Sequence, residues 1–143
     1  MKESYLRQAE EEYVKRLRAY CSFKSVEIKE RSELPGGKCV SKEGEDILKV
    51  LPDKAYKIAM CIEGKQLSSE ELAKHFDDVT NRGFSEIAFI IGGSDGLSEE
   101  VKGKCDMRLS FSKLTFPHQL MRVILTEQIY RSFTILAGGK YHK

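Results

Sequence analysis

The chain has 143 residues, of which 41% are hydrophobic, so it is long and apolar enough for one folded domain and is not expected to be disordered. No apolar run approaches the roughly 20 residues that span a membrane, so no transmembrane helix is expected. The first residues lack the apolar stretch of a signal peptide, so no export is expected. The net charge is only +2, but residues 102–143 carry eight Lys and Arg against two acidic residues.

The first half of the chain predicts two helices and a strand. Apolar residues at helical spacing predict a helix over 4–20, and alternation with period two predicts a strand over 23–29 with one wet face. The segment 30–39 contains a Pro-Gly-Gly sequence and is predicted to be a loop. A second helix is expected over 39–50.

The middle of the chain predicts a strand, a turn and a well-defined helix. A mostly buried strand is expected over 55–62, followed by a turn over 63–67. Ser68 and Glu71 have the spacing of a capping box, which predicts the start of the third helix. An Asn-Arg-Gly sequence at 81–83 predicts its end.

The second half of the chain continues the alternation of strands and helices. Residues 86–91 form the most apolar run, which favours a central parallel strand covered on both faces. A short helix is expected to begin at 98–100, a last strand over 107–112 and a final, nearly all-apolar helix over 118–136. Strands that alternate with helices predict an α/β fold, with a mostly parallel sheet and helices on both faces.

A glycine turn follows the most apolar strand. Ligands of such sheets bind beyond the carboxyl ends of the strands, where this turn and the loop 113–118 are expected to lie. No Lys follows Gly96, which excludes a Walker loop, and the glycine spacing does not fit a dinucleotide fingerprint. The turn either joins strand to helix tightly or lets a ligand approach the backbone closely.

Composition and motifs narrow the chemistry further. No two cysteines have C-x-x-C spacing and the histidines are scattered, so no metal site is expected. Isolated thiols are typical of a reducing compartment, which predicts a cytoplasmic protein. The basic last third favours a polyanionic partner such as nucleic acid, although an unevenly charged solvated surface explains it equally well.

The sequences "FIIGGSDGL", "LSFSKLTFPHQLMRVILTEQIYR" and "YHK", in this order and spacing, closely resemble the RlmH family of bacterial SPOUT-class methyltransferases, which act on large-subunit ribosomal RNA. The resemblance covers nearly the whole chain and is strongest over 86–143. It implies one SPOUT methyltransferase domain over 1–143, with a C-terminal trefoil knot, that works as a homodimer. It further implies that S-adenosylmethionine is the methyl donor and that N3 of a pseudouridine in 23S rRNA, expected within the assembled ribosome, is the acceptor.

The resemblance also implies a donor site in which the glycines make room for a bent S-adenosylmethionine. The residues implied to contact the donor are Met60, Gly92, Phe111, Ser112, Lys113, Leu114, Thr115 and Phe116. The adenine can be read by backbone groups of the loops and the methionyl end by short polar groups. No phosphate is bound, which explains the absence of a Walker lysine.

Methylation at N3 requires loss of an imide proton, and the resulting anion spreads onto two carbonyl oxygens. Arg122 is a candidate to stabilise that anion, and His118 or His142 to accept the proton. His118 is equally suited to a hydrogen bond at the helix start, and Arg122 to pairing with Glu127 or to a dimer contact.

The four-residue tail 140–143 is predicted to be too short to fold back far on its own subunit. Tyr141 and His142 are therefore expected to complete the active site of the partner subunit, by orienting the target base or taking its proton.

One departure from the family pattern bears on function. Members of the family usually begin with a short apolar strand and a Val-Gly-Lys turn, whereas this sequence begins inside the first helix. Either the start is truncated or the sheet lacks that strand, and an exposed edge is expected where the strand belongs. An alternative function is a dimeric module that binds S-adenosylmethionine or RNA without turnover. A third is a dimeric interaction protein that uses the apolar last helix as its interface.

Overall fold

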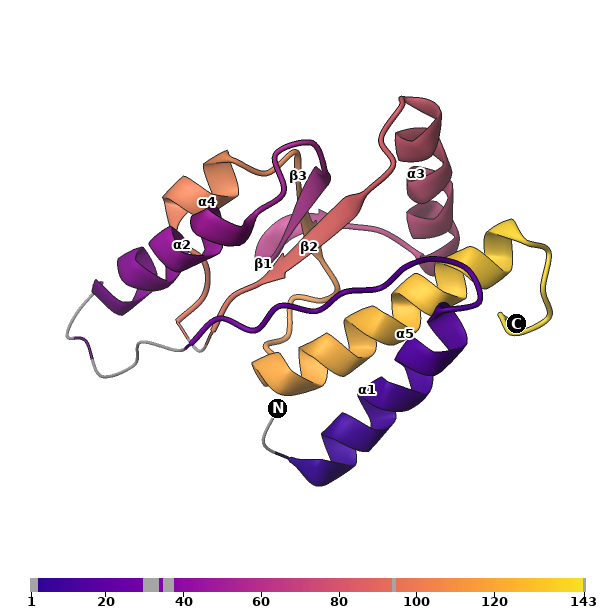
Figure 1. Ribbon diagram of the computed structural model, residues 1–143, viewed down its shortest axis with the longest axis horizontal. Helices are drawn as coiled ribbons and strands as arrows, with labels where there is room; N and C mark the ends of the chain where they lie inside the picture. Colours follow the sequence, from indigo (N-terminus) through magenta and orange to yellow (C-terminus); the bar gives the residue numbers. More distant parts are fainter. Residues whose placement is uncertain (1–2, 30–33, 35–37, 94, 143) are drawn as a thin grey trace. The chain divides into compact units, whose positions relative to one another are not determined.

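The computed structural model describes residues 3–29, 34, 38–93 and 95–142, and these form five α-helices and three β-strands (Figure 1). The helices and strands fall into two compact units. Unit 1 is built from the described residues of 1–25, 67–82 and 116–143, and unit 2 from those of 26–66 and 83–115. None of the described helices has both the length and the apolar character that crossing a membrane requires.

Unit 1 consists of the helices α1 (Ser4–Leu17), α3 (Ser69–Asn81) and α5 (His118–Leu136), and α5 packs against both others (Figure 1). A helix that is apolar nearly all round has more than one side to bury, which explains its place between two partners. The ring of Phe133 on α5 lies 5.9 Å from that of Tyr20 and 6.0 Å from that of Phe76, centroid to centroid.

The ends of α3 follow local signals. Ser68 Oγ accepts a hydrogen bond from Glu71 N (3.1 Å), and Ser68 N donates to Glu71 Oε1 (2.8 Å). This reciprocal pair is the predicted capping box. Gly83 follows the helix with a φ of +100°, which only glycine adopts at little cost.

Unit 2 contains a parallel sheet of β1 (Tyr56–Gln66), β2 (Ile87–Ile91) and β3 (Met107–Ser110) in the order β2-β1-β3. The predicted parallel α/β architecture is thus confirmed. The prediction that residues 86–91 form the central strand is wrong, because β1 pairs on both sides and β2 forms an edge of this sheet. Within β2 only Ile90 is buried, so an apolar run does not by itself determine whether a strand is central or at the edge of the sheet.

β1 is longer than expected, because the predicted turn over 63–67 continues the strand as far as Gln66. The pairing register with β3 shifts on the way, since Leu109 faces Met60 and again Lys65. Gly64 lies in this irregular stretch, where a Cβ would come within 2.7 Å of the backbone N and C of Leu109. Only glycine allows this close approach of two strands.

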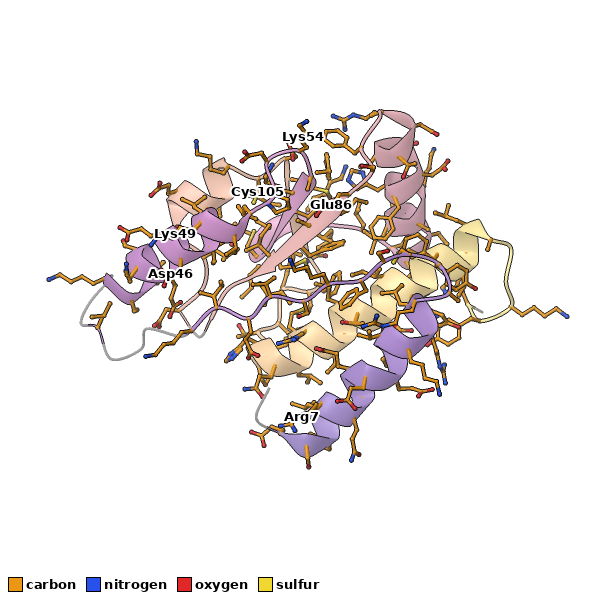
Figure 2. The ribbon with its side chains drawn as sticks, viewed as in Figure 1. Arg7, Asp46, Lys49, Lys54, Glu86 and Cys105 are labelled. Atoms are coloured by element: carbon orange, nitrogen blue, oxygen red, sulfur yellow. The ribbon has the colours of Figure 1, made fainter. Side chains whose placement is uncertain are left out.

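Two helices of unit 2 contribute to one cluster with the sheet, α2 (Lys38–Val50) and α4 (Glu99–Gly103). Both were expected from the sequence. The buried members are Ala59 of β1, Ile90 of β2, and Leu97 and Val101 from the segment around α4. The partly buried residues packed against them are Ile47, Leu48, Leu51 and Cys105, the last labelled in Figure 2. Because Ala59 and Ile90 are register partners, this cluster lies on one face of the sheet.

The segment 23–29 is not a strand, in contrast to the prediction. Most of its residues are exposed, and Val26 keeps 53% of its surface accessible. Alternating polarity places the apolar side chains of an extended segment on one face. A β-strand also requires a neighbouring strand whose backbone pairs with its N–H and C=O groups. Most of the predicted loop over 30–39 lies outside the described residues.

Candidate functional site

The carboxyl ends of β2 and β3 lie at one edge of the sheet of unit 2, level with Met60 in the middle of β1. Met60 of β1 is the register partner of Ile91 in β2 and of Leu109 in β3. Because the strands are parallel, the chain leaves β2 and β3 on the same side of the sheet. Met60, the turn that begins at Gly92 and the loop that begins at Phe111 are therefore neighbours. The binding of a ligand at this edge stays a prediction.

The turn after β2 is held together by its own backbone. Gly96 N donates to Gly93 O (3.0 Å), and Gly96 has a φ of +83°. A Cβ on Gly92 would lie 2.6 Å from Gly96 C and 2.9 Å from Leu97 N. Backbone atoms of the turn itself thus occupy the space that a Cβ on Gly92 would need. The contact of Gly92 with S-adenosylmethionine that the resemblance implies stays a prediction.

This geometry predicts that Gly92→Ala destabilises unit 2 by about 1–3 kcal/mol, because the new methyl group overlaps backbone atoms that cannot move independently. Gly103→Ala is the matched control, since a Cβ at that position of α4 meets nothing within 4 Å and φ is not positive. The control is expected to be neutral or stabilising by up to about 1 kcal/mol. Urea unfolding monitored by circular dichroism measures both, and equal midpoints for the two variants would contradict the close approach.

The loop after β3 is shaped by two serine hydroxyls. Ser110 Oγ donates to Ser112 O (2.9 Å) and accepts from Ser112 N (3.3 Å), while Ser112 Oγ accepts from Leu114 N (2.9 Å). Such local hydroxyl–backbone bonds define compact loops. The loop presents Lys113, Leu114 and Thr115 to solvent, and Leu114 keeps 71% of its surface accessible.

The edge therefore offers loop backbone, short hydroxyl side chains and apolar side chains such as that of Leu114. These groups suit a ligand with an uncharged aromatic ring, because backbone N–H and C=O groups can form hydrogen bonds with polar atoms at the edge of the ring. Phe116, the last of the residues that the resemblance implies contact the methyl donor, belongs to unit 1. The described part of the chain contains no group of three or more His, Cys, Asp or Glu side chains that could hold a metal ion.

Arg122 is anchored within unit 1. Its Nε forms an ion pair with Glu10 Oε2 at 2.6 Å, and its Nη2 donates to Ser25 Oγ at 2.7 Å. Both charged side chains are largely buried, with 25% of Arg122 and 14% of Glu10 exposed. Arg122 thus ties α5 to α1, a pairing that was not among the sequence-based alternatives of Glu127 or a dimer contact. His118 begins α5, one helical turn before Arg122.

The C-terminal tail folds back on its own chain, which corrects the prediction that it is too short to do so. Gly138 has a φ of +72°, and Gly139 N donates to Thr134 O (2.8 Å). These two features reverse the chain directly after α5. The ring of Tyr141 then packs edge-on against that of Tyr130, with centroids 4.8 Å apart.

A network of charges holds the tail in this position. Tyr141 Oη and Arg131 Nη2 both donate to Glu127 Oε2, each at 2.7 Å. Arg131 Nη1 lies 2.9 Å from His142 Nδ1, and His142 Nε2 contacts Glu70 Oε1 of α3. The partners come from α3, α5 and the tail, so no local sequence pattern could have revealed them.

The network determines which atoms carry protons. Because a guanidinium only donates, His142 Nδ1 accepts from Arg131 and the ring proton resides on Nε2, facing Glu70. The hydrogen bond from His142 lowers the pKa of Glu70, so this carboxyl is ionised. Burial, together with the hydrogen bond to Glu127, raises the pKa of Tyr141 well above its usual range, so its phenol donates hydrogen bonds and does not act as a base.

Comparison with known proteins places the chain in a family. A family model described as "Predicted SPOUT methyltransferase" matches residues 1–142, and the chain belongs to this SPOUT methyltransferase family. The resemblance drawn from the sequence motifs is thereby confirmed.

Curated relatives carry a more particular name, ribosomal RNA large subunit methyltransferase H. That of Clostridioides difficile (strain 630) is 49% identical over 150 residues, and that of Streptococcus thermophilus (strain CNRZ 1066) is 48% identical over 149. The relative from Ligilactobacillus salivarius (strain UCC118) is 48% identical over 151 residues. Each alignment covers 100% of this chain and 94% of the relative.

Proposed function

We propose that the protein transfers a methyl group from S-adenosylmethionine to N3 of a pseudouridine in 23S rRNA. The observation that carries the proposal is the meeting of Met60, the turn after β2 and the loop after β3 at the carboxyl edge of a parallel sheet in a SPOUT methyltransferase. The name of the relatives supports large-subunit rRNA as the substrate. The proposal includes a knotted single domain over 1–143 that acts as a cytoplasmic homodimer on the assembled ribosome.

The edge of unit 2 fits the proposed donor. Leu114 keeps 71% of its surface accessible and so provides apolar surface of the kind that an adenine ring contacts. Met60, only 8% exposed, lies in the core beside this edge, at the point where the regular pairing of β1 ends. Loop N–H and C=O groups recognise the edge of such a ring without any charged side chain. When bound, S-adenosylmethionine supplies a methyl group made electrophilic by its sulfonium, and the protein contributes chiefly by positioning.

Arg122 is the proposed electrostatic catalyst for the RNA base. Removing the N3 proton creates an anion shared by two carbonyl oxygens, and a guanidinium stabilises such an anion by donating to it. Glu10 and Ser25 hold the guanidinium in one orientation. Donors that are already oriented stabilise developing charge more than mobile ones, because they need no reorganisation during the reaction.

The proposed proton acceptor is a histidine of unit 1. His118 shares a helix face with Arg122, one turn away, and is our first candidate. His142 accepts from Arg131 at Nδ1 and carries its proton on Nε2, so it would take a proton only after leaving Arg131. Tyr141 is assigned the role of orienting the base, and it could donate its single O–H proton to the base only after releasing Glu127.

The decisive experiment incubates the protein with labelled S-adenosylmethionine and, in parallel, free 23S rRNA, large subunits and whole ribosomes. We expect one methylated pseudouridine, found by mass spectrometry of nuclease fragments, with whole ribosomes as the best substrate. Donor binding by calorimetry without any methyl transfer would refute the proposal and indicate a module without turnover. Failure to bind the donor at all would indicate an interaction protein instead.

A further inference from the structure

Helix α2 contacts the turn after β2 and the start of α4. Cys39, at the start of α2, donates from Sγ to Asp95 Oδ2 at 3.3 Å. Cys39 is only 4% exposed, whereas Asp95 is exposed within the turn. The hydrogen bond to Asp95 raises the pKa of the Cys39 thiol, so the thiol stays protonated and remains the donor.

A second contact lies five residues further along α2. Gly44 is buried, and a Cβ placed on it would lie 2.5 Å from Ser98 Oγ, 3.2 Å from Ser98 Cβ and 3.3 Å from Val101 Cγ2. Glycine is unfavourable inside a helix, so its presence here is explained by the close packing of α2 on the start of α4. Ser98 Oγ has its own role, because it accepts from Val101 N (3.2 Å) and caps α4.

Ser98 is linked to the candidate donor site through a short series of contacts. Its neighbour Leu97 is 8% exposed and belongs to the same core cluster as Val101 and Ala59. The backbone of Leu97 lies against Gly92, with no room for even a Cβ between them. A displacement of Ser98 would therefore be transmitted to Leu97 and from there to Gly92.

We propose that α2 positions the donor-binding turn, and that Gly44 is a positioning residue that sets the affinity for S-adenosylmethionine by letting α2 lie directly on Ser98. The inference rests on the proposed function. The Cys39–Asp95 hydrogen bond holds the middle of the turn, and the Gly44–Ser98 contact holds its end.

The test compares Gly44→Ala, Ser98→Ala and the double variant. Gly44→Ala is expected to weaken S-adenosylmethionine binding about tenfold or more, and to raise the donor KM with kcat little changed, because the turn is displaced while the chemistry is not. Ser98→Ala is expected to cost less than about threefold, since it loses one helix-capping bond. The double variant should recover most of the affinity lost in Gly44→Ala, because the atom at 2.5 Å from the new methyl group is gone, while the milder contacts at 3.2 Å and 3.3 Å remain.

Calorimetry measures the donor Kd, and urea unfolding measures stability on the same samples. A fall in stability for Gly44→Ala with an unchanged Kd would show that the glycine serves folding only and would overturn the proposal. Lack of rescue in the double variant would overturn it equally. If wild-type protein does not bind S-adenosylmethionine, the proposed function itself fails, which this design separates from failure of the positioning role.

A further variant keeps the proposal testable should Gly44→Ala not fold. Cys39→Ala removes the thiol donor to Asp95 without adding any atom to the packed face of α2. We expect a donor Kd about three- to tenfold weaker at unchanged kcat, because the turn loses one of its two supports. A donor Kd equal to that of the wild type would contradict the role of α2.

Discussion

Replacing Arg122 with Ala is expected to lower methyl transfer to ribosomal RNA by about 100-fold or more, because the imide anion loses its pre-oriented cationic donor. The same change leaves the largely buried Glu10 without its partner. Breaking a buried ion pair from one side costs about 3–5 kcal/mol, so the variant is also expected to unfold at lower urea concentration. Both the rate and the unfolding midpoint are measured at a temperature where the protein remains folded.

Two matched variants separate catalysis from anchoring. Glu10→Gln breaks the same ion pair but keeps the guanidinium, and we expect activity within about tenfold of the wild type. The double variant Glu10→Gln/Arg122→Ala removes both charges, so stability should recover while activity stays low. If activity recovers together with stability, Arg122 serves only to hold α5 on α1.

Two inactive variants mixed as subunits are expected to regain about a quarter of wild-type activity if the tail of one subunit completes the site of its partner in the proposed homodimer. One variant lacks residues 140–143, and the other carries Leu114→Asp in the donor loop. Half of the randomly reassorted dimers are mixed, and each of those has one intact site of two. Leu114 is chosen because an exposed side chain tolerates a charge, whereas a branched residue at Gly92 would disturb the turn itself.

The contacts of the tail on its own subunit set a condition for action in trans. Tyr141 and His142 are held on their own subunit by Glu127, Arg131 and Glu70. The proposed trans action thus requires that a docked, ordered tail be presented to the partner, and not that a loose tail reach across.

The outcome of the mixing experiment decides whether the tail acts in trans or in cis. Activity that stays at zero after subunit exchange, verified by mass spectrometry of tagged chains, would refute action in trans. Lys140→Ala serves as the control within the tail, because Lys140 is exposed, and it should behave like the wild type.

Most of the helices could be predicted because their signals lie close together in the sequence. The capping box of Ser68 and Glu71 specifies the start of α3, and a glycine follows its end. The all-round apolar pattern of α5 required partners on more than one side, and the structure provides α1 and α3. The parallel arrangement of the strands, and with it the shared edge of the candidate donor site, followed from the alternation of strands and helices.

The tertiary structure alone decided features that depend on residues far apart in the chain. Residues 23–29 have the alternation of a strand but find no ladder among the described residues, and β1 takes the central place through pairing on both sides. Arg122 pairs with Glu10 and the tail docks on Glu127 and Glu70, contacts of long sequence separation. Local sequence patterns determine which segments can be helical or extended. Strand pairing, ion pairs and close contacts at glycines depend instead on which distant segments come together, and only the folded chain decides that.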